Sequence, residues 1–346
     1  MRHSTLAIVS FFLFAKAAVA GDFWFYEWVN PPVPSQTIEA MSEGGDRENG
    51  NITSARAHDV VPSYRQGDKR WIVTGFEYEP YQGQVKALSS LPLANRISVL
   101  FSRPPSPVLA AEYLELARSW REHGISGQIK FVGSLPTALE AKIIKPVCEL
   151  GVRVSFVSSY LPGQDEIENL NSLGECVKVD FSLGRYFRFE EIEILKRLKN
   201  VSLGLTNNYF PVTAHVNYLN LIGTPVDLRV VGAIPASDQL TTLGKTEKLT
   251  GLFLDMDAFA SEEQYSVLEK IDRSIAQKLT MRWAFRAPRE LELKAWAQIK
   301  PARLQIVAEA LTTKGVEEKL RALSADQTEV IIETFSLTSR TFRPEF

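Results

Sequence analysis

The segment "VKVDFSLGRYFRFEEIEILKRLKNVSLGLT", residues Val177 to Thr206, contains the pattern that decides the fold. Its first six residues, Val177–Ser182, alternate apolar and polar side chains, which is typical of a β-strand. The stretch Phe189–Leu198 has apolar residues at the spacing of an amphipathic helix, and a second strand pattern follows at Val201–Thr206. Strand, helix and strand at this spacing predict two parallel strands joined by a crossover helix.

The same unit repeats along most of the chain. Short runs rich in β-branched and aromatic residues alternate with amphipathic stretches such as Thr137–Leu150 and Ser261–Ser274. The predicted strands are Trp71–Glu77, Ile97–Ser102, Ile129–Gly133, Val152–Val157, Val177–Ser182, Val201–Thr206, Val226–Val231, Leu252–Asp257, Leu279–Ala284, Ala302–Val307 and Thr328–Glu333. Helices follow prolines and end at Gly151, Asn200 or Gly223, residues that accept the left-handed conformation at a helix C-terminus. The chain is therefore predicted to be an α/β protein with a parallel sheet.

Two architectures fit this repeat. A (β/α)8 TIM-like barrel closes eight strands into a ring, whereas a leucine-rich-repeat-like α/β solenoid stacks them into an open horseshoe. The strand patterns "VKVDFS" and "VDLRVV" carry charged residues on one face, which a horseshoe exposes to water and a barrel has to bury or pair. The segment "LTGLFLDMDAF" matches the leucine spacing of a repeat, but other units lack the asparagine ladder of such solenoids. We take the barrel as the prediction and the solenoid as the alternative.

The aromatic segment "GDFWFYEWVNPP", residues Gly21 to Pro32, supplies the first strand of that barrel. Alternation places Phe23 and Phe25 on one face and Trp24, Tyr26 and Trp28 on the other. A strand that is apolar on both faces is typical of a parallel barrel, where both faces are buried. We therefore expect a barrel-like domain over residues 21–247. Residues 248–346 are expected to form a C-terminal βα extension, either separate or continuous with the same domain.

The first twenty residues predict a signal peptide. Arg2 and His3 form a basic start, Leu6–Phe14 is apolar, and Ala18–Ala20 is a small-x-small cleavage site. The apolar run is too short to span a bilayer, so we expect a periplasmic or secreted protein without a membrane span after cleavage. Cleavage removes two basic residues and no acidic residue, which takes the formal net charge from −2 to −4. This balance gives no electrostatic reason to expect nucleic acid as a partner.

The two cysteines, Cys148 and Cys176, are predicted to form a disulfide. Cys148 ends the helix that leads into the strand at Val152, and Cys176 directly precedes the strand at Val177. If these two parallel strands are neighbours, both cysteines lie at the same end of the sheet within bridging distance. Disulfides persist in the oxidising compartments to which exported proteins are sent.

Four segments carry a resemblance to a known group of proteins. These are "FWFYEWVNPP", "LARSWREHGISGQIKF", "VRVSFVSSYL" and "CVKVDFSLGRYF". Together they are similar to the strand series of an uncharacterised family of secreted bacterial proteins with glycosidase-like (β/α)8 barrels, over about residues 21–235. The resemblance implies a barrel and carbohydrate chemistry. The family has acidic residues at the end of the strand after the W-x3-G segment, whereas this chain has Lys130, Phe131, Val132 and Gly133 there.

Several chemistries lack the residues they need. The histidines after the predicted signal peptide, His58, His123 and His215, are widely separated, and no zinc-binding cysteine–histidine pattern occurs. The chain also has no G-x-S-x-G elbow and no dinucleotide-binding glycine fingerprint after a predicted strand. We therefore expect neither a metal nor an organic cofactor.

Carboxylates and aromatic residues at the predicted strand ends remain as candidates. Glycoside cleavage needs two carboxyl groups, separated by about 5–5.5 Å for retention and 6.5–9.5 Å for inversion of configuration. Glu27, Glu77 and Asp180 are the candidate catalytic residues, because a barrel mouth could bring acids from different strands together. Sugar-stacking rings and amide groups make up the candidate substrate-binding residues, which are Trp24, Trp28, Tyr78, Asn207, Asn208 and Tyr209.

These residues lead to two functional hypotheses. The first is an exported carbohydrate-active protein, a glycoside hydrolase that acts on a polysaccharide through a carboxylate pair. The alternative is a non-catalytic binding or scaffold protein of the cell envelope, for which a protein partner is also open. Convergence of Glu27, Glu77 and Asp180 in one pocket would favour the hydrolase.

Overall fold

The computed structural model describes residues 23–29, 61–66, 69–76, 80, 83–90, 95–256, 261–285, 287–308, 314–325 and 328–334. The strands among these residues are β1 (Phe23–Val29), β2 (Val61–Gln66), β3 (Lys69–Phe76), β4 (Arg96–Phe101), β5 (Ser126–Val132), β6 (Arg153–Ser158), β7 (Val177–Phe181), β8 (Ser202–Asn207), β9 (Val226–Val231), β10 (Leu249–Met256), β11 (Leu279–Phe285), β12 (Arg303–Ala308) and β13 (Glu329–Thr334). The main helices are α3 (Ala110–Glu122), α4 (Ala138–Glu149), α5 (Gln164–Leu173), α6 (Phe189–Leu195), α7 (Thr213–Ile222), α8 (Ser237–Leu243), α9 (Glu262–Leu268), α11 (Glu290–Ile299) and α12 (Lys314–Ala325). Shorter helical turns are α2 (Gln84–Ala87), η2 (Leu88–Ser90), η3 (Pro107–Leu109), η4 (Gly174–Cys176) and α10 (Arg273–Ala276).

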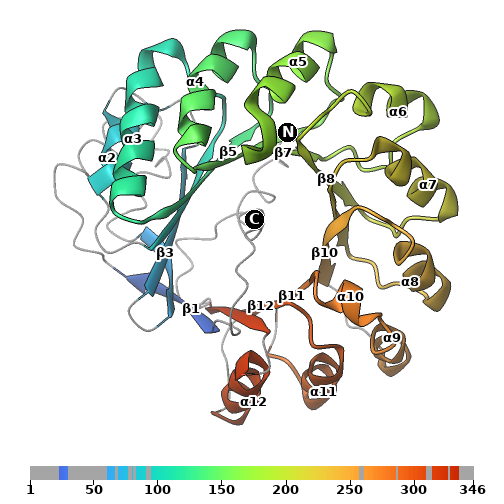
Figure 1. The fold of residues 1–346 in the computed structure, drawn as a ribbon. Helices are drawn as coiled ribbons and strands as arrows, with labels where there is room; N and C mark the ends of the chain where they lie inside the picture. The colour runs from blue at the N-terminus through green and yellow to red at the C-terminus, as the bar shows by residue number, and fades with distance from the viewer. Residues whose placement is uncertain are drawn as a thin grey trace, which may run out of the picture.

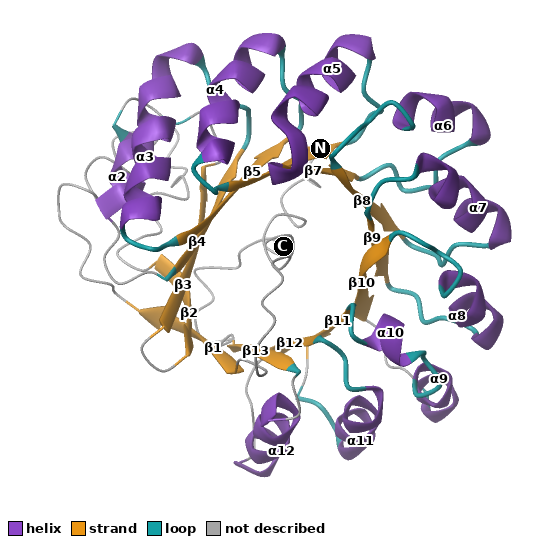
Figure 2. Cartoon of the chain, in the orientation of Figure 1, coloured by secondary structure: helices purple, strands orange, loops and turns teal. Residues whose placement is uncertain are grey.

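The repeating βα architecture expected from the sequence is confirmed. Strands β4 to β13 follow one another in the sheet in chain order, all parallel, with at least one helix between each strand and the next. All eleven strands predicted after residue 70 are present, with ends that differ from the expected ones by up to three residues. The aromatic segment also forms the expected first strand, β1. Figures 1 and 2 show the strands on the inside of the molecule and the helices around the outside.

The number of paired strands differs from the eight of a TIM barrel. Among the described residues, β1 pairs with β13 on one side and with β2 on the other, so the strand order closes over thirteen strands. Strands β10 to β13 continue the same sheet past residue 247. The wider arrangement has a physical reason, because an eight-stranded barrel has just enough interior space for side chains to fill, and here several strands carry long charged residues on the inner face.

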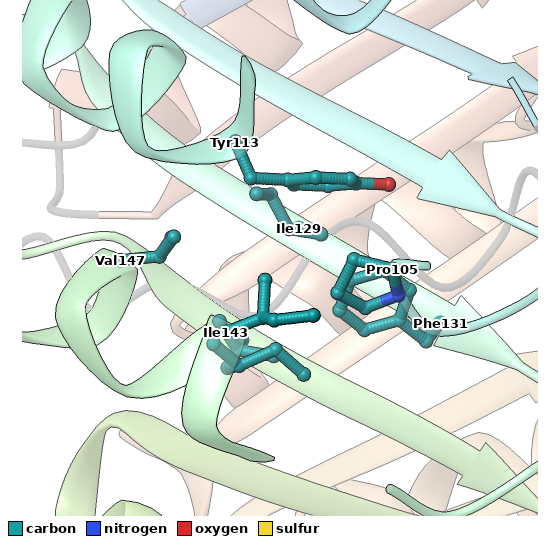
Figure 3. A pocket seen from close by; sticks show the side chains of 8 residues that line it. Pro105, Tyr113, Ile129, Phe131, Ile143 and Val147 are labelled. Carbon is teal, nitrogen blue, oxygen red and sulfur yellow. The ribbon is translucent and has the colours of Figure 1, made fainter. Parts of the chain in front are cut away.

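The helix-facing side of the sheet forms the hydrophobic core. Phe101, Phe131 and Phe156 lie on adjacent strands with neighbouring ring centroids 5.8 and 5.5 Å apart, and Trp283 on β11 contacts Trp296 on α11. Figure 3 shows one part of this layer, in which Ile129 and Phe131 of β5 meet apolar residues of α3 and α4. This region encloses no space for a water molecule, so it is packing rather than a ligand site.

Prolines and carboxylates define the helix starts. Pro136 precedes the N-cap Thr137 of α4 and so lies two positions before Ala138, the first helical position at which proline is favoured. The Thr137 N–H and hydroxyl donate to the Glu140 carboxylate, and the Glu140 N–H donates back to Thr137 Oγ1. The N-cap N–H groups of the next two helices make a similar bond. That of Gly163 in α5 donates to the Glu166 carboxylate, and that of Arg188 in α6 donates to the Glu191 carboxylate. The capping box of α4 and the single N-cap bonds of α5 and α6 fix where these three loops enter their helices.

The predicted disulfide between Cys148 and Cys176 is present, with 5.7 Å between the Cα atoms. It joins the C-terminal turn of α4 to η4, directly before β7. The positions expected to end helices in the left-handed conformation also adopt it, with φ of 90° at Gly151, 57° at Asn200 and 77° at Gly223. No helix in the described part of the chain is both long and apolar enough to cross a bilayer.

Candidate functional site

A network of ion pairs crosses the inner face of the sheet between β5 and β10. The Lys178 Nζ atom lies 3.0 Å from Asp180 Oδ1 and 2.9 Å from Asp227 Oδ2, so one ammonium group joins two carboxylates. Asp180 Oδ2 lies 3.8 Å from the Nζ atom of Lys130 on β5. The Thr250 hydroxyl on β10 donates a 2.7 Å hydrogen bond to Asp227 Oδ1. The charged residues that alternation in "VKVDFS" predicts on one face therefore form ion pairs with residues of other strands.

A second group continues this network toward β11. The Asp255 carboxylate accepts hydrogen bonds from Arg229 at 2.5 Å and from Arg282 at 2.9 Å. The Arg229 guanidinium also lies over the Phe253 ring, 4.5 Å from its centroid. Two arginines from neighbouring strands thus share one carboxylate, and Arg229 also interacts electrostatically with Asp180 of the first group.

Gly204 of β8 makes the first network geometrically possible. This glycine is the register partner of both Asp180 and Asp227, and it lies between their two strands. A Cβ atom at position 204 would lie 1.7 Å from Asp180 Oδ1 and 3.0 Å from the Lys178 Cε atom. The absence of a side chain at Gly204 therefore lets the Asp180 carboxylate and the Lys178 stem occupy the space over β8.

The surroundings of the two lysines in this network shift their pKa values in opposite directions. Burial lowers the pKa of Lys130 to about 7, although Asp180 acts in the opposite direction. Burial would also lower the pKa of Lys178, but the two adjacent carboxylates Asp180 and Asp227 raise it above its ordinary value. Burial would raise the pKa of Asp180, but Lys178 and Lys130 hold it below its usual range. Asp180 is therefore ionised and cannot serve as a proton donor at neutral pH.

Exposed aromatic rings follow three neighbouring strands at the C-terminal edge of the sheet. Tyr160 follows β6, Phe189 begins the helix after β7, and Tyr209 follows β8, with exposed fractions of 39%, 57% and 41%. The Tyr160 hydroxyl donates to Glu166 at 2.8 Å and accepts from the Leu135 N–H at 3.1 Å. All three rings are partly exposed, and the Phe189 ring also contacts the Tyr218 ring of α7, with 5.9 Å between centroids.

Tyr209 is held by a small cluster. Its hydroxyl accepts a 3.3 Å hydrogen bond from the Tyr186 N–H, and the Tyr186 hydroxyl donates to the Tyr209 carbonyl at 3.0 Å. The Tyr186 ring stacks on His215 with 4.5 Å between centroids. Burial lowers the pKa of His215, and its Nδ1 atom accepts from the Val212 N–H, so the ring is neutral at pH 7. These contacts fix the orientation of the exposed Tyr209 ring.

The structure places the predicted substrate-binding residues in different surroundings. Asn207 is buried on the same side of β8 as Leu203 and Leu205, the side opposite Gly204, and its amide atoms have no hydrogen-bond partner among the described residues. Asn208 and Tyr209 are exposed in the following loop. Asn207 and Asn208 are therefore adjacent in the sequence but lie in opposite environments, one buried and one exposed.

The remaining predicted residues belong to the N-terminal segments. Glu27, Trp24 and Trp28 lie on β1, where Trp24 is in register with Ile331 and Trp28 with Pro62. Glu77 and Tyr78 lie outside the described residues. The convergence of Glu27, Glu77 and Asp180 thus stays a prediction, and the acidic residue that the described structure places beside Asp180 is Asp227.

Sequence reasoning did not select Lys130, Asp227, Tyr160 or Phe189 as site residues. Lys130 could have been found as the charged residue in the otherwise apolar core of its strand, "IKFV". Tyr160 and Phe189 carried a weaker signal, which was their position in the loops that follow predicted strands. The partners of Asp227 had no sequence signal, because they depend on the register between β7, β8 and β9.

The donors that a metal ion would need are not gathered in the described part of the chain. No group of three or more histidine, cysteine, aspartate or glutamate side chains there lies close enough to hold an ion.

Comparison with protein-family models, with curated proteins and with solved structures finds no match, so the candidate site is defined by the geometry of this chain.

Proposed function

We propose that this protein is an exported carbohydrate-active protein that binds a polysaccharide at the C-terminal edge of its sheet. The observation that carries the proposal is the row of exposed rings at Tyr160, Phe189 and Tyr209. Aromatic rings offer flat apolar faces with little conformational freedom to lose, which suits stacking against the apolar face of a sugar ring. Hydrogen bonds already orient Tyr160 and Tyr209, so binding would cost little ordering entropy there.

The arrangement of the rings favours an extended ligand. They lie after β6, β7 and β8, with Phe189 at the start of α6, and these three strands are consecutive, directly paired and parallel. Neighbouring strands are about 4.8 Å apart, and the helices that follow them are spaced more widely. A chain of several sugar units could therefore contact more than one ring at once. The predicted signal peptide would place the protein where envelope polysaccharides are found.

Affinity electrophoresis of the mature chain in gels containing soluble polysaccharides tests this proposal. We expect Phe189→Ala and Tyr209→Ala each to weaken binding about tenfold, equivalent to about 1.4 kcal/mol. Leu221→Ala is the matched control, because Leu221 is also an exposed apolar residue, at 48%, but lies in the last turn of α7, away from this edge. Equal affinities for all three variants and the unchanged protein, or no retardation by any polysaccharide, would contradict the proposal.

Hydrolysis is a second candidate function, favoured by one observation. Because Lys178 lies 3.0 Å from Asp180 and 2.9 Å from Asp227, the two carboxylate oxygens are no more than about 6 Å apart, near the spacing of retaining glycosidases. The lowered pKa of Asp180 suits a nucleophile rather than an acid. In a reducing-end assay on the same polysaccharides, Asp180→Asn and Asp227→Asn should each abolish release of reducing ends while Leu221→Ala retains it. Activity in both acid variants would exclude this chemistry at these residues.

A further inference from the structure

A cavity at the opposite edge of the sheet is not explained by sugar binding. It has a volume of about 190 Å³ and lies beside the residues that lead into β11 and β12, at the N-terminal ends of these parallel strands. The exposed rings of the proposed sugar site instead follow the C-terminal ends of β6, β7 and β8. Pockets for drug-sized ligands usually enclose roughly 300–1,000 Å³, so this cavity suits a smaller molecule.

An enlarged helix-to-strand connection forms this cavity. The chain between α9 and β11 spans residues 269–278 and includes α10, whereas the connections before β9 and β12 span only residues 223–225 and 300–302. The Ala302 N–H donates to the Ala276 carbonyl at 3.0 Å, which ties α10 to the residue before β12. The cavity therefore lies between the α9–α10 segment and the end of the neighbouring helix α11 (Figure 1).

Charged groups of opposite sign line the cavity. Glu269 and Arg273 both belong to the α9–α10 segment, and they do not form an ion pair with each other. The Arg273 side chain is exposed and makes no ion pair or hydrogen bond with any residue in the described part of the chain. A guanidinium group presents its N–H donors in a planar fork, which matches the two oxygens of a carboxylate. Arg273 is therefore placed to bind a ligand that carries a carboxylate.

The Glu269 carboxylate is held from the other wall of the cavity. Gln298 of α11, with its amide nitrogen directed at Glu269, donates to the two carboxylate oxygens at 2.5 and 2.8 Å, and this orientation satisfies both groups. A carboxylate has about four acceptor positions, so Glu269 can accept further hydrogen bonds. The Gln298 amide oxygen is then another acceptor beside the cavity. These oxygens suit an ammonium group, which has donors only.

Apolar groups complete the cavity and limit the character of its ligand. The remaining lining consists of Lys300, at the end of α11, together with Ile271, Ala276, Ile299, Pro301 and Ala302. A charge that leaves water costs free energy unless it meets an opposite charge. The cavity therefore favours a ligand that has one anionic group, one cationic group and a small hydrocarbon part.

We propose that this cavity binds a small α-amino acid. Its carboxylate lies on Arg273, its ammonium group on Glu269 and Gln298, and its side chain on the apolar wall. An α-amino acid carries all three features on one carbon atom, whereas a simple carboxylate or amine meets only one of the two protein charges. This inference is independent of polysaccharide binding at the other edge of the sheet.

Isothermal titration calorimetry of the mature chain with glycine, L-alanine and L-valine tests the proposal. We expect at least one of them to bind with a dissociation constant of about 1 mM or less. Acetate and ethylamine, which each carry one of the two charges, should bind at least tenfold more weakly. Equal affinity for acetate would show a site for anions only, and equal affinity for ethylamine a site for cations only. Either result would overturn the proposal, as would the absence of binding by all three amino acids.

Two variants locate the binding site. Arg273→Gln and Glu269→Gln each remove one charge from an exposed side chain of the cavity, and each should weaken amino-acid binding at least tenfold. Arg197→Gln is the matched control, because Arg197 is also an exposed arginine at this edge, before β8, but does not line the cavity. Retardation by polysaccharides should be the same in all three variants. Undiminished amino-acid binding in either cavity variant would refute the assignment.

Discussion

At the residue scale, the described site depends on one small residue and the charges placed over it. Gly204 has no positive φ and ends no helix, so its role is the space above it rather than backbone freedom. That space holds the Asp180 carboxylate, and Asp180 joins Lys130 to Lys178. Buried ion pairs of this kind contribute little net stability when intact, but removing one contact leaves an uncompensated buried charge.

Gly204→Ala is therefore expected to destabilise the protein by roughly 3–5 kcal/mol, because Asp180 would have to move away from its partners. Urea unfolding followed by circular dichroism measures the change. Gly244→Ala is the matched control, since a Cβ there would make only ordinary contacts, the nearest at 3.5 Å, and φ at Gly244 is −57°. A free energy of unfolding within about 1 kcal/mol of that control would show that Asp180 can be rearranged at no cost.

At the scale of elements, each repeat consists of a strand, a capped helix and a connection to the next strand of the sheet. Helices begin after N-cap residues such as Thr137 and end at residues in the left-handed conformation, such as Gly151 and Gly223. The Cys148–Cys176 disulfide adds a covalent link between two successive repeats, from the end of α4 to the start of β7. It encloses α5 and β6, so it restricts one complete unit in the unfolded chain.

Replacing both cysteines, Cys148→Ser with Cys176→Ser, should lower the free energy of unfolding by roughly 3–4 kcal/mol, because a link across 28 residues no longer restricts the unfolded chain. Guanidinium unfolding with and without a reducing agent measures this effect. The unmodified protein should lose stability on reduction, and the double variant should be insensitive to it. Equal stability of both proteins without reducing agent would contradict the prediction.

At the scale of the whole molecule, sheet pairing joins the two ends of the described chain. β13 pairs with β1, and β9 pairs with β10 across the boundary at residue 247. The C-terminal strands therefore cover two sheet edges, one on β1 and one on β9. Uncovered strand edges pair readily with other chains and lead to aggregation.

Truncation after residue 247 is thus expected to give an aggregating or unfolded protein. Size-exclusion chromatography and the cooperativity of thermal unfolding check this expectation. The full mature chain is the control. A monomeric truncated protein with a cooperative transition would show that residues 21–247 fold independently, as the first domain expected from the sequence would.

Much of this architecture follows from the sequence by itself. Alternation in segments such as Val177–Ser182, separated by amphipathic stretches, determines parallel strands and crossover helices, because side-chain period and connection length are local properties. β2 was missed, since Pro62 and Gln66 make a weak strand pattern that gains its hydrogen bonds only from β1 and β3. The disulfide could be predicted because its cysteines flank two successive strands.

Only the tertiary structure decided how many strands pair and which charges meet. The number of strands depends on sheet twist and pairing over the whole chain, which no single repeat contains. The meeting of Lys130, Asp180 and Asp227 depends on register across five strands, β5 to β9, and on the space over Gly204. The sequence by itself determined a charged inner face. Its pairing into one network is a property of distances that local pattern cannot specify.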